Sequence, residues 1–127
     1  MMNEPIDKVY GRTVSEWIAS MPAELRTHAV SLWHVSASGA NYFELTGIDL
    51  RNFIERGIVA LLGAGAIPVK SGKGTSFEWI AEQEYGIDKN DIARVIMRQW
   101  DASSKDDNYL FSIWFALPGP YVGNVAT

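Results

Sequence analysis

The chain of 127 residues contains no cysteine. Disulfides, zinc sites built on thiolates and cysteine nucleophiles are therefore excluded. No uninterrupted apolar run approaches the roughly 18 residues that a membrane span needs. The start, MMNEPIDKVYGR, also lacks the basic and then apolar pattern of a signal peptide. These absences lead us to expect a soluble protein of a reducing compartment, most simply the cytoplasm.

Internal repeats and low-complexity linkers are missing as well, and the length suits one domain over residues 1–127. Hydrophobic residues make up 47% of the chain, which is enough to bury a core. We expect the tail after about residue 121 to be loose, because chain ends are often poorly ordered.

What the chain does have is an uneven charge. The formal net charge is -4, yet residues 1–77 contribute nothing to it because their seven acidic and seven basic side chains cancel. The excess lies in residues 78–107, which hold eight acidic and four basic side chains, and residues 108–127 are uncharged. An acidic segment disfavours phosphate backbones and favours basic partners. It can equally serve only to solvate a helical face.

Capping signals and apolar periodicity predict five helices. Thr13 and Glu16 form a capping box, Pro22 suits the first turn of the second helix, and Gly39 marks its end. Asp88 caps the last one. We expect the helices over about residues 14–20, 22–37, 47–63, 76–84 and 89–101.

Two other apolar segments favour strands. Ile67–Val69 is β-branched and contains proline, which suggests an edge strand or an extended segment. Tyr109–Leu117 is a short aromatic run ended by Pro118, and we expect a strand over Leu110–Phe115 rather than a helix. The predicted fold is therefore α+β, predominantly α, with about five helices and a short two-stranded β element.

The segment SGKGTS looks like the phosphate-gripping turn of a nucleotide kinase. A P-loop needs four residues between its glycines, so that successive N–H groups curl around one phosphate. Here the residue five before Gly72 is Ile67, and Pro68 removes a donor. No alternating βαβ pattern surrounds the segment. We interpret it as a turn whose Thr75 or Ser76 caps the next helix, and we expect no nucleotide or other cofactor.

Candidate catalytic and metal-binding groups are sparse. His28 and His34 would lie about 240° apart around one helix, so they cannot share a metal. The serines near them indicate no nucleophile with a base and an orienting group. Carboxylates such as Asp106 and Asp107 more commonly solvate a surface than form a catalytic pair across a cleft. We therefore predict no catalytic, cofactor-binding or metal-binding residues, and no enzyme.

Aromatic residues make up 12% of the chain. Trp17, Trp33 and Trp79 fall on apolar helix faces, where we expect them in the core. Trp100, Tyr109 and Trp114 flank or follow the acidic loop WDASSKDDNY. Aromatic side chains rimmed by charge suit the centre of a protein interface. Alternatively, they seal the core where the last helix meets the last strand.

A family resemblance is carried by the layout of about residues 46–117. Its features are LRNFI at 50–54, LLGAGAIPV at 61–69, Trp79, Tyr85-Gly86, Ile92, Ile96, Trp100 and an acidic loop before an aromatic strand. This layout resembles small bacterial immunity proteins, the partners of contact-dependent growth-inhibition toxins. The resemblance implies a non-enzymatic cytoplasmic protein that binds and blocks a cognate toxin domain, often a nuclease.

An acidic surface suits such a role, because a nuclease grips phosphates with a basic cleft and opposite charge speeds association. We predict that charge reversal at Asp101, Asp106 and Asp107 slows binding. No direct contact with nucleic acid or membrane is expected. The predicted partner-binding residues are Glu82, Glu84, Asp88, Asp91, Trp100, Asp101, Asp106, Asp107 and Tyr109.

Two alternatives remain open. One is a small-molecule-binding protein or enzyme with a pocket between helices. A deep polar pocket containing His28 or His34 would favour it, and a filled core would count against it. The other is an adaptor for another basic protein.

Overall fold

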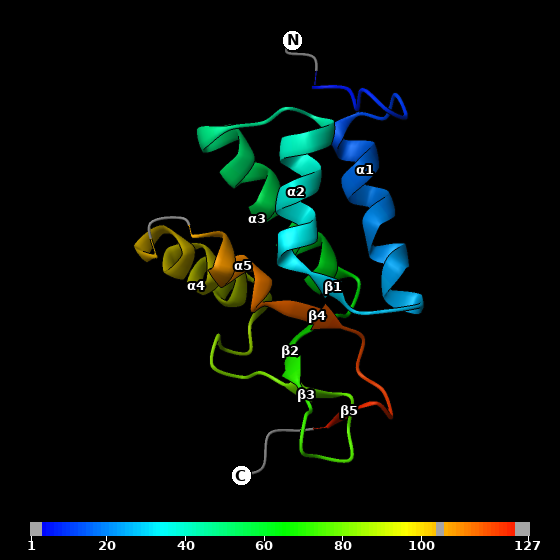
Figure 1. The fold of residues 1–127 in the computed structure, drawn as a ribbon, viewed down its shortest axis with the longest axis vertical. Coiled ribbons are helices and arrows are strands. Elements are labelled where there is room, and N and C mark those ends of the chain that lie inside the picture. Colours follow the sequence, from blue (N-terminus) through cyan, green and yellow to red (C-terminus); the bar gives the residue numbers. More distant parts are fainter. Residues whose placement is uncertain (1–3, 104–105, 124–127) are drawn as a thin grey trace.

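The computed structural model describes residues 4–103 and 106–123, which form five α-helices, one 3₁₀ helix and five strands (Figure 1). The helices are α1 (Val14–Ser20), the 3₁₀ helix η1 (Met21–Arg26), α2 (Leu32–Tyr42), α3 (Gly47–Gly63), α4 (Lys89–Ala102) and α5 (Asp107–Phe111). The strands are β1 (Val30–Ser31), β2 (Ile67–Ser71), β3 (Trp79–Ala81), β4 (Trp114–Ala116) and β5 (Val122–Gly123). The α+β class is confirmed, but a two-stranded element understates the sheet.

The core lies around α3, which packs against α1, α2 and α4. In Figure 1 the helices α1, α2 and α3 stand together above the sheet, and α4 and α5 lie to one side. The apolar stripe expected on the third helix is buried, apart from the half-buried Leu50. Its buried members are Phe53, Ile54, Ile58, Leu61 and Leu62.

Two glycines let α2 and α3 approach closely. A Cβ on Gly39 would lie 2.7 Å from Cδ1 of Phe53, and a Cβ on Gly57 would lie 2.6 Å from Cγ1 of Val35. Both distances are well below the roughly 3.5–4.0 Å of an ordinary carbon–carbon contact. The prediction that Gly39 ends a helix is therefore wrong, because this glycine lies inside α2 and makes room for Phe53.

The five strands form one sheet in the order β1-β4-β2-β3-β5, in which only the β3–β5 pair is parallel. Val69 stands opposite both Trp114 and Ala81, so these three side chains share one face. Phe115 points to the other face, stands opposite Val30, and is fully buried in the main core. The sheet thus has one face in the core and one face turned away from it.

Three of the five predicted helices are confirmed with close to the expected bounds. The capping box at α1 is complete: the Thr13 hydroxyl accepts from the Glu16 N–H at 3.1 Å, and Glu16 accepts from the Thr13 N–H at 3.0 Å. Asp88 caps α4 by accepting from the N–H groups of Asn90 and Asp91. The third, α3, begins and ends where its apolar pattern does.

The predicted second helix, from Pro22 to about residue 37, is wrong. The chain instead forms η1, breaks, pairs Val30 and Ser31 with β4, and then begins α2 at Leu32. Ser31 caps α2 by accepting from the Trp33 N–H at 3.1 Å. The pairing with residues more than 80 positions later decides this break, and local periodicity carries no information about it.

The predicted fourth helix over 76–84 is also wrong, because Trp79–Ala81 is strand β3. Phe77, Trp79 and Ala81 recur every second residue, which is a strand period. In SGKGTS, Ser71 ends β2 and the remaining five residues belong to the hairpin loop between β2 and β3. The Thr75 hydroxyl donates to the Gly72 carbonyl at 2.6 Å and accepts from the Phe77 N–H at 3.0 Å. The segment is a turn, as predicted, but it caps no helix.

The last apolar run is divided. Its first part belongs to α5, which Asp106 caps by accepting from the Asn108 N–H at 2.9 Å. Only Trp114–Ala116 forms a strand, so the strand expected over Leu110–Phe115 is right in its second half alone. Beyond Tyr121, expected to be loose, Val122–Gly123 pairs with β3. The rest of that expected tail, 124–127, lies outside the described residues.

Candidate functional site

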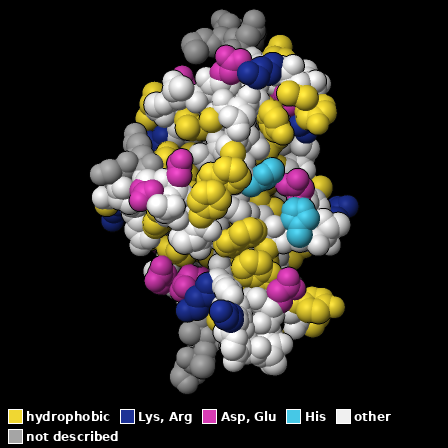
Figure 2. All heavy atoms as spheres, in the orientation of Figure 1, with side chains coloured by type: hydrophobic (Ala, Val, Ile, Leu, Met, Phe, Trp, Pro, Cys, Tyr) yellow, Lys and Arg dark blue, Asp and Glu magenta, His cyan; other side chains and the backbone are white. Residues whose placement is uncertain are grey.

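The most distinctive surface is a group of four aromatic side chains, which we call the aromatic face: Trp33, Phe111, Trp79 and Trp114. The rings of Trp33 and Phe111 stack at 4.7 Å with an angle of 14° between them. These two side chains remain 38% and 48% exposed. In Figure 2 hydrophobic side chains run along the middle of this face, with both histidines beside them.

Trp79 and Trp114 cover the outer face of the sheet. Their rings lie 5.3 Å apart, and both side chains are half buried. Val69 and Ala81, on the same face, are buried although they lie outside the main core. The two tryptophans therefore shield the outer face of the sheet and leave part of their own rings in water.

A surface hollow of about 430 Å³ adjoins the aromatic face. Its lining includes Glu24, His28, His34, Trp33, Phe111 and Trp114. One carboxylate oxygen of Glu24, Oε2, is inaccessible to water and has no hydrogen-bond partner among the described residues. It lies 3.5 Å from Nε2 of His34, which carries a positive charge only when protonated. His28 is occupied elsewhere, since its Nδ1 lies 2.8 Å from the Ala29 carbonyl oxygen.

Glu24 and His34 also line a second hollow of about 360 Å³, which lies between α1, η1 and α2. This hollow is more polar and contains Arg12 and the buried Ser38. A guanidinium nitrogen of Arg12 lies 3.3 Å from a carboxylate oxygen of Asp7, and its Nε is buried with no hydrogen-bond partner in residues 4–103 and 106–123. The two hollows bring together charged groups that the sequence did not single out as a site.

Most of the predicted partner-binding acids are engaged within the chain. Three of them form ion pairs, measured from a carboxylate oxygen to a side-chain nitrogen. These are Glu82 with Lys70 at 3.6 Å, Asp91 with Arg94 at 3.2 Å and Asp101 with Arg51 at 2.8 Å. Asp88 and Asp106 cap α4 and α5. Asp88 and Asp101 bracket α4 and lie roughly 20 Å apart along its axis. The structure therefore does not gather these acids into one patch.

Two predicted residues, Glu84 and Tyr109, do come together. Burial first, and then the negative charge of Glu84, raises the pKa of Tyr109 to about 12. The Tyr109 hydroxyl donates to Gln99 at 2.6 Å. Burial likewise raises the pKa of the neighbouring Tyr85, with smaller contributions from Tyr109 and Glu84. Asp107 begins the helix that carries Tyr109 and is exposed.

Trp100 lies elsewhere: it is only 4% exposed and belongs to the main core. Its indole N–H has no hydrogen-bond partner among the described residues. Trp33, which the sequence placed in the core, is exposed instead. The alternation of Phe77, Trp79 and Ala81 could have indicated an outward strand face. No comparable signal marked Trp33 or Phe111, because their stacking depends on the contact between α2 and α5.

In the described part of the chain, no group of three or more His, Asp or Glu side chains could hold a metal ion. In the same residues, no helix is long and apolar enough to cross a bilayer. No protein-family model, curated protein or solved structure matches the sequence or the fold.

Proposed function

We propose that the protein is a non-enzymatic binding protein that covers a basic domain of a partner through its aromatic face. The partner we propose is a toxin domain, such as a nuclease, that the protein neutralises in the cytoplasm. The observation that carries the proposal is the exposed stack of Trp33 on Phe111, next to the Trp79–Trp114 pair.

Exposed aromatic rings favour an interface over a solvated surface. Tryptophan and phenylalanine bury a large apolar area with few rotatable bonds, so such residues dominate the affinity of many interfaces. The two rings of the stack already restrict one another, and little further ordering is needed when a partner covers them. Both pairs also rest on regular elements rather than on long loops, which supports a preformed site.

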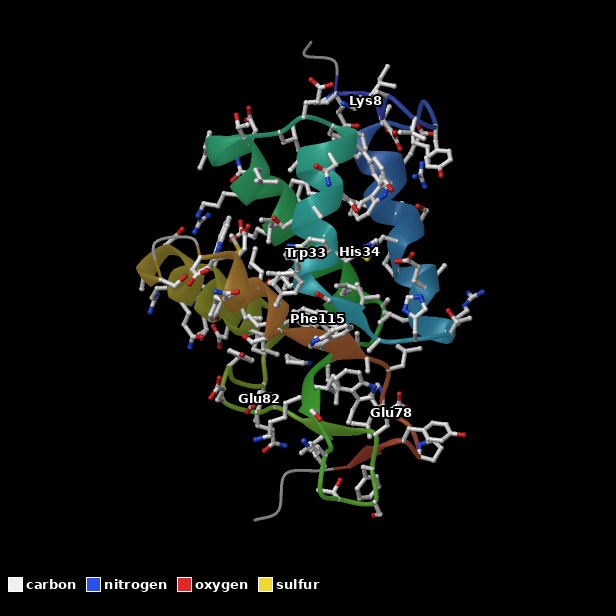
Figure 3. All side chains as sticks on the ribbon, viewed as in Figure 1. Lys8, Trp33, His34, Glu78, Glu82 and Phe115 are labelled. Carbon is white, nitrogen blue, oxygen red and sulfur yellow. The ribbon has the colours of Figure 1, made fainter. Side chains whose placement is uncertain are left out.

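Carboxylates lie on the same side of the molecule as the aromatic face. Figure 3 places Glu78 and Glu82 to either side of β3, below Phe115, and His34 beside Trp33. Glu78 is exposed and has no ion pair among the described residues. Negative groups at a rim speed association with a basic partner and orient it, although each adds little to affinity.

Reversing the charge of Asp101 or Asp106 would also break the Arg51 pair or the cap of α5, so these variants change stability as well as charge. Glu78 and Asp107 are cleaner choices, because both are exposed and neither caps a helix or pairs with a described cation. We expect Glu78→Lys with Asp107→Lys to slow association at low salt, with a smaller effect at high salt. An unchanged rate and salt dependence would remove the acidic rim from the proposal.

The aromatic face is tested by co-expression with the neighbouring open reading frame and capture of the basic domain it encodes. We compare Trp33→Ala/Phe111→Ala with Ile48→Ala/Ile87→Ala, a control pair that also removes two exposed apolar side chains. The aromatic pair should weaken binding roughly 30- to 1,000-fold, because interface aromatics typically contribute about 1–2 kcal/mol or more each. The control pair should bind like the wild type. Equal affinity of all three proteins would show that another face binds.

A second candidate function is favoured by the polar hollow that contains Arg12 and His34. The Nε of Arg12 has no partner in the part of the chain that the structure describes, as expected if a small polar ligand completes the site. Native mass spectrometry of the purified protein tests this candidate. A co-purifying small molecule that is lost in His34→Ala would favour ligand binding over the protein-binding role.

A further inference from the structure

The hollow beside the aromatic face combines a carboxylate with aromatic walls. Glu24 supplies the carboxylate from η1, and Trp33, Phe111 and Trp114 supply the rings from α2, α5 and β4. No Lys or Arg is present among the described residues that line it. The carboxylate of Glu24 therefore has no permanently charged partner among the described residues of this hollow.

The Oε2 atom of Glu24 accepts no hydrogen bond from the described residues. Although Oε2 itself is shielded, the Glu24 side chain as a whole is 41% exposed, so its carboxylate faces the hollow without a cation other than a protonated His34 beside it. His34 lies near Oε2 at 3.5 Å, but no hydrogen bond joins the two side chains. A cationic N–H donor that enters the hollow would bind the exposed part of the carboxylate and balance its charge, whereas an anion would be repelled.

The rings around Glu24 favour the same ligand. A cation over the face of an indole or phenyl ring is attracted by the ring electrons. Arginine suits such a place better than lysine. Its guanidinium is planar, stacks on aromatic rings, and presents several N–H donors in a fixed geometry that matches a carboxylate.

We propose that this hollow is a receptor for one arginine side chain, which the partner protein inserts between the aromatic rings and the carboxylate of Glu24. This inference rests on the proposed protein-binding function and names the chemistry of the contact. A basic partner domain carries such side chains on its surface, and the hollow opens on the face that we propose it covers.

The test uses an acetylated and amidated Gly-Arg-Gly tripeptide as the probe. Two matched peptides replace the arginine by citrulline, its neutral isostere, or by lysine. The five tryptophans give five indole N–H signals in an NMR spectrum, assigned with single Trp→Phe variants. The arginine peptide should shift the signals of Trp33 and Trp114 in the millimolar range and leave Trp100 unchanged.

Two variants with intact folds, checked by thermal unfolding, make the assignment specific. Glu24→Gln should weaken the binding of the arginine peptide about tenfold or more, because the loss of one charge-assisted contact of roughly 1.4 kcal/mol gives this factor. Glu44→Gln removes an exposed carboxylate outside the hollow and should change binding less than about twofold. The citrulline peptide should bind wild type about as weakly as the arginine peptide binds Glu24→Gln.

Any one of four results would overturn the proposal of an arginine receptor. The arginine peptide causes no shift, the citrulline peptide binds as tightly as the arginine peptide, the lysine peptide binds as tightly, or both glutamate variants lose the same affinity for the arginine peptide. Self-association that depends on Glu24 would assign the hollow to a second copy and overturn the partner assignment.

Capture of the partner separates this inference from the proposed function. If Trp33→Ala/Phe111→Ala loses the partner but Glu24→Gln retains it fully, the receptor fails and the binding function stands. If the peptide binds as expected but no partner domain is captured, the binding function fails and the hollow remains a guanidinium site.

Discussion

Substitution of Gly57 by alanine tests the crossing of α2 and α3, which holds Trp33 and His34 in place. The new methyl group would lie 2.6 Å from Cγ1 of Val35, about 1 Å closer than an ordinary contact. Overpacking of this kind costs about 1–3 kcal/mol. Alanine regains about 1 kcal/mol over glycine in a helix interior. We therefore expect a net loss of about 1 kcal/mol in the free energy of unfolding.

Urea denaturation measures this change directly, and a loss of that size would lower Tm by about 4 °C in a domain of this length. Gly63→Ala is the matched control in the same helix, because a Cβ there meets no atom within 4 Å apart from its chain neighbours and the adjacent backbone of its own helix. It should be neutral or slightly stabilising. Val35→Ala combined with Gly57→Ala should show favourable coupling, since the smaller side chain removes the clash. If Gly57→Ala stabilises the protein as much as an exposed Gly→Ala change does, the close crossing is refuted.

Three further predictions concern single side chains. Thr13→Ala removes half of the capping box with Glu16 and should cost about 1 kcal/mol by urea denaturation, so an unchanged midpoint would contradict the cap. Burial raises the pKa of Asp7, but hydrogen bonds from two backbone N–H groups and Arg12 outweigh it and hold that pKa below the ordinary value. Its stabilising effect is therefore present at neutral pH and lost as pH falls through the lowered pKa, so Asp7→Asn should destabilise at pH 7 and match wild type in strong acid. Glu84→Gln should lower the pKa of Tyr109 from about 12, which an ultraviolet titration of tyrosinate detects and an unchanged pKa would contradict.

The parts of the fold that local signals determine were predictable from the sequence. The cap at Thr13, the stripe of α3 and the cap at Asp88 each depend on residues a few positions apart. The breaks in the predicted second and fourth helices depend on strand pairing instead. Val30 pairs with Phe115, so residues near it in the chain do not determine the break in the second helix. Trp79 pairs with Val122 but also with Ser71 across a local hairpin, and the alternation of Phe77, Trp79 and Ala81 was a local signal for that strand.

The candidate site was harder to predict for the same reason. The acidic excess of residues 78–107 is real, but caps and ion pairs within the chain use much of it. The sequence predicted a second helix that begins earlier and is longer than α2, and Trp33 lies on the apolar side of that predicted helix. With α2 beginning at Leu32, that side chain points outward and meets Phe111. Only the tertiary arrangement places Glu24 beside both rings.

Hydrogen–deuterium exchange of the protein, alone and with the basic domain of its co-expressed neighbour, tests the central claim most directly. The account predicts slower exchange on binding in residues 30–34, 79–81 and 109–116, which carry the aromatic face, and little change in α3. Slower exchange confined to α3 and the start of α4, with the aromatic segments unchanged, would contradict it.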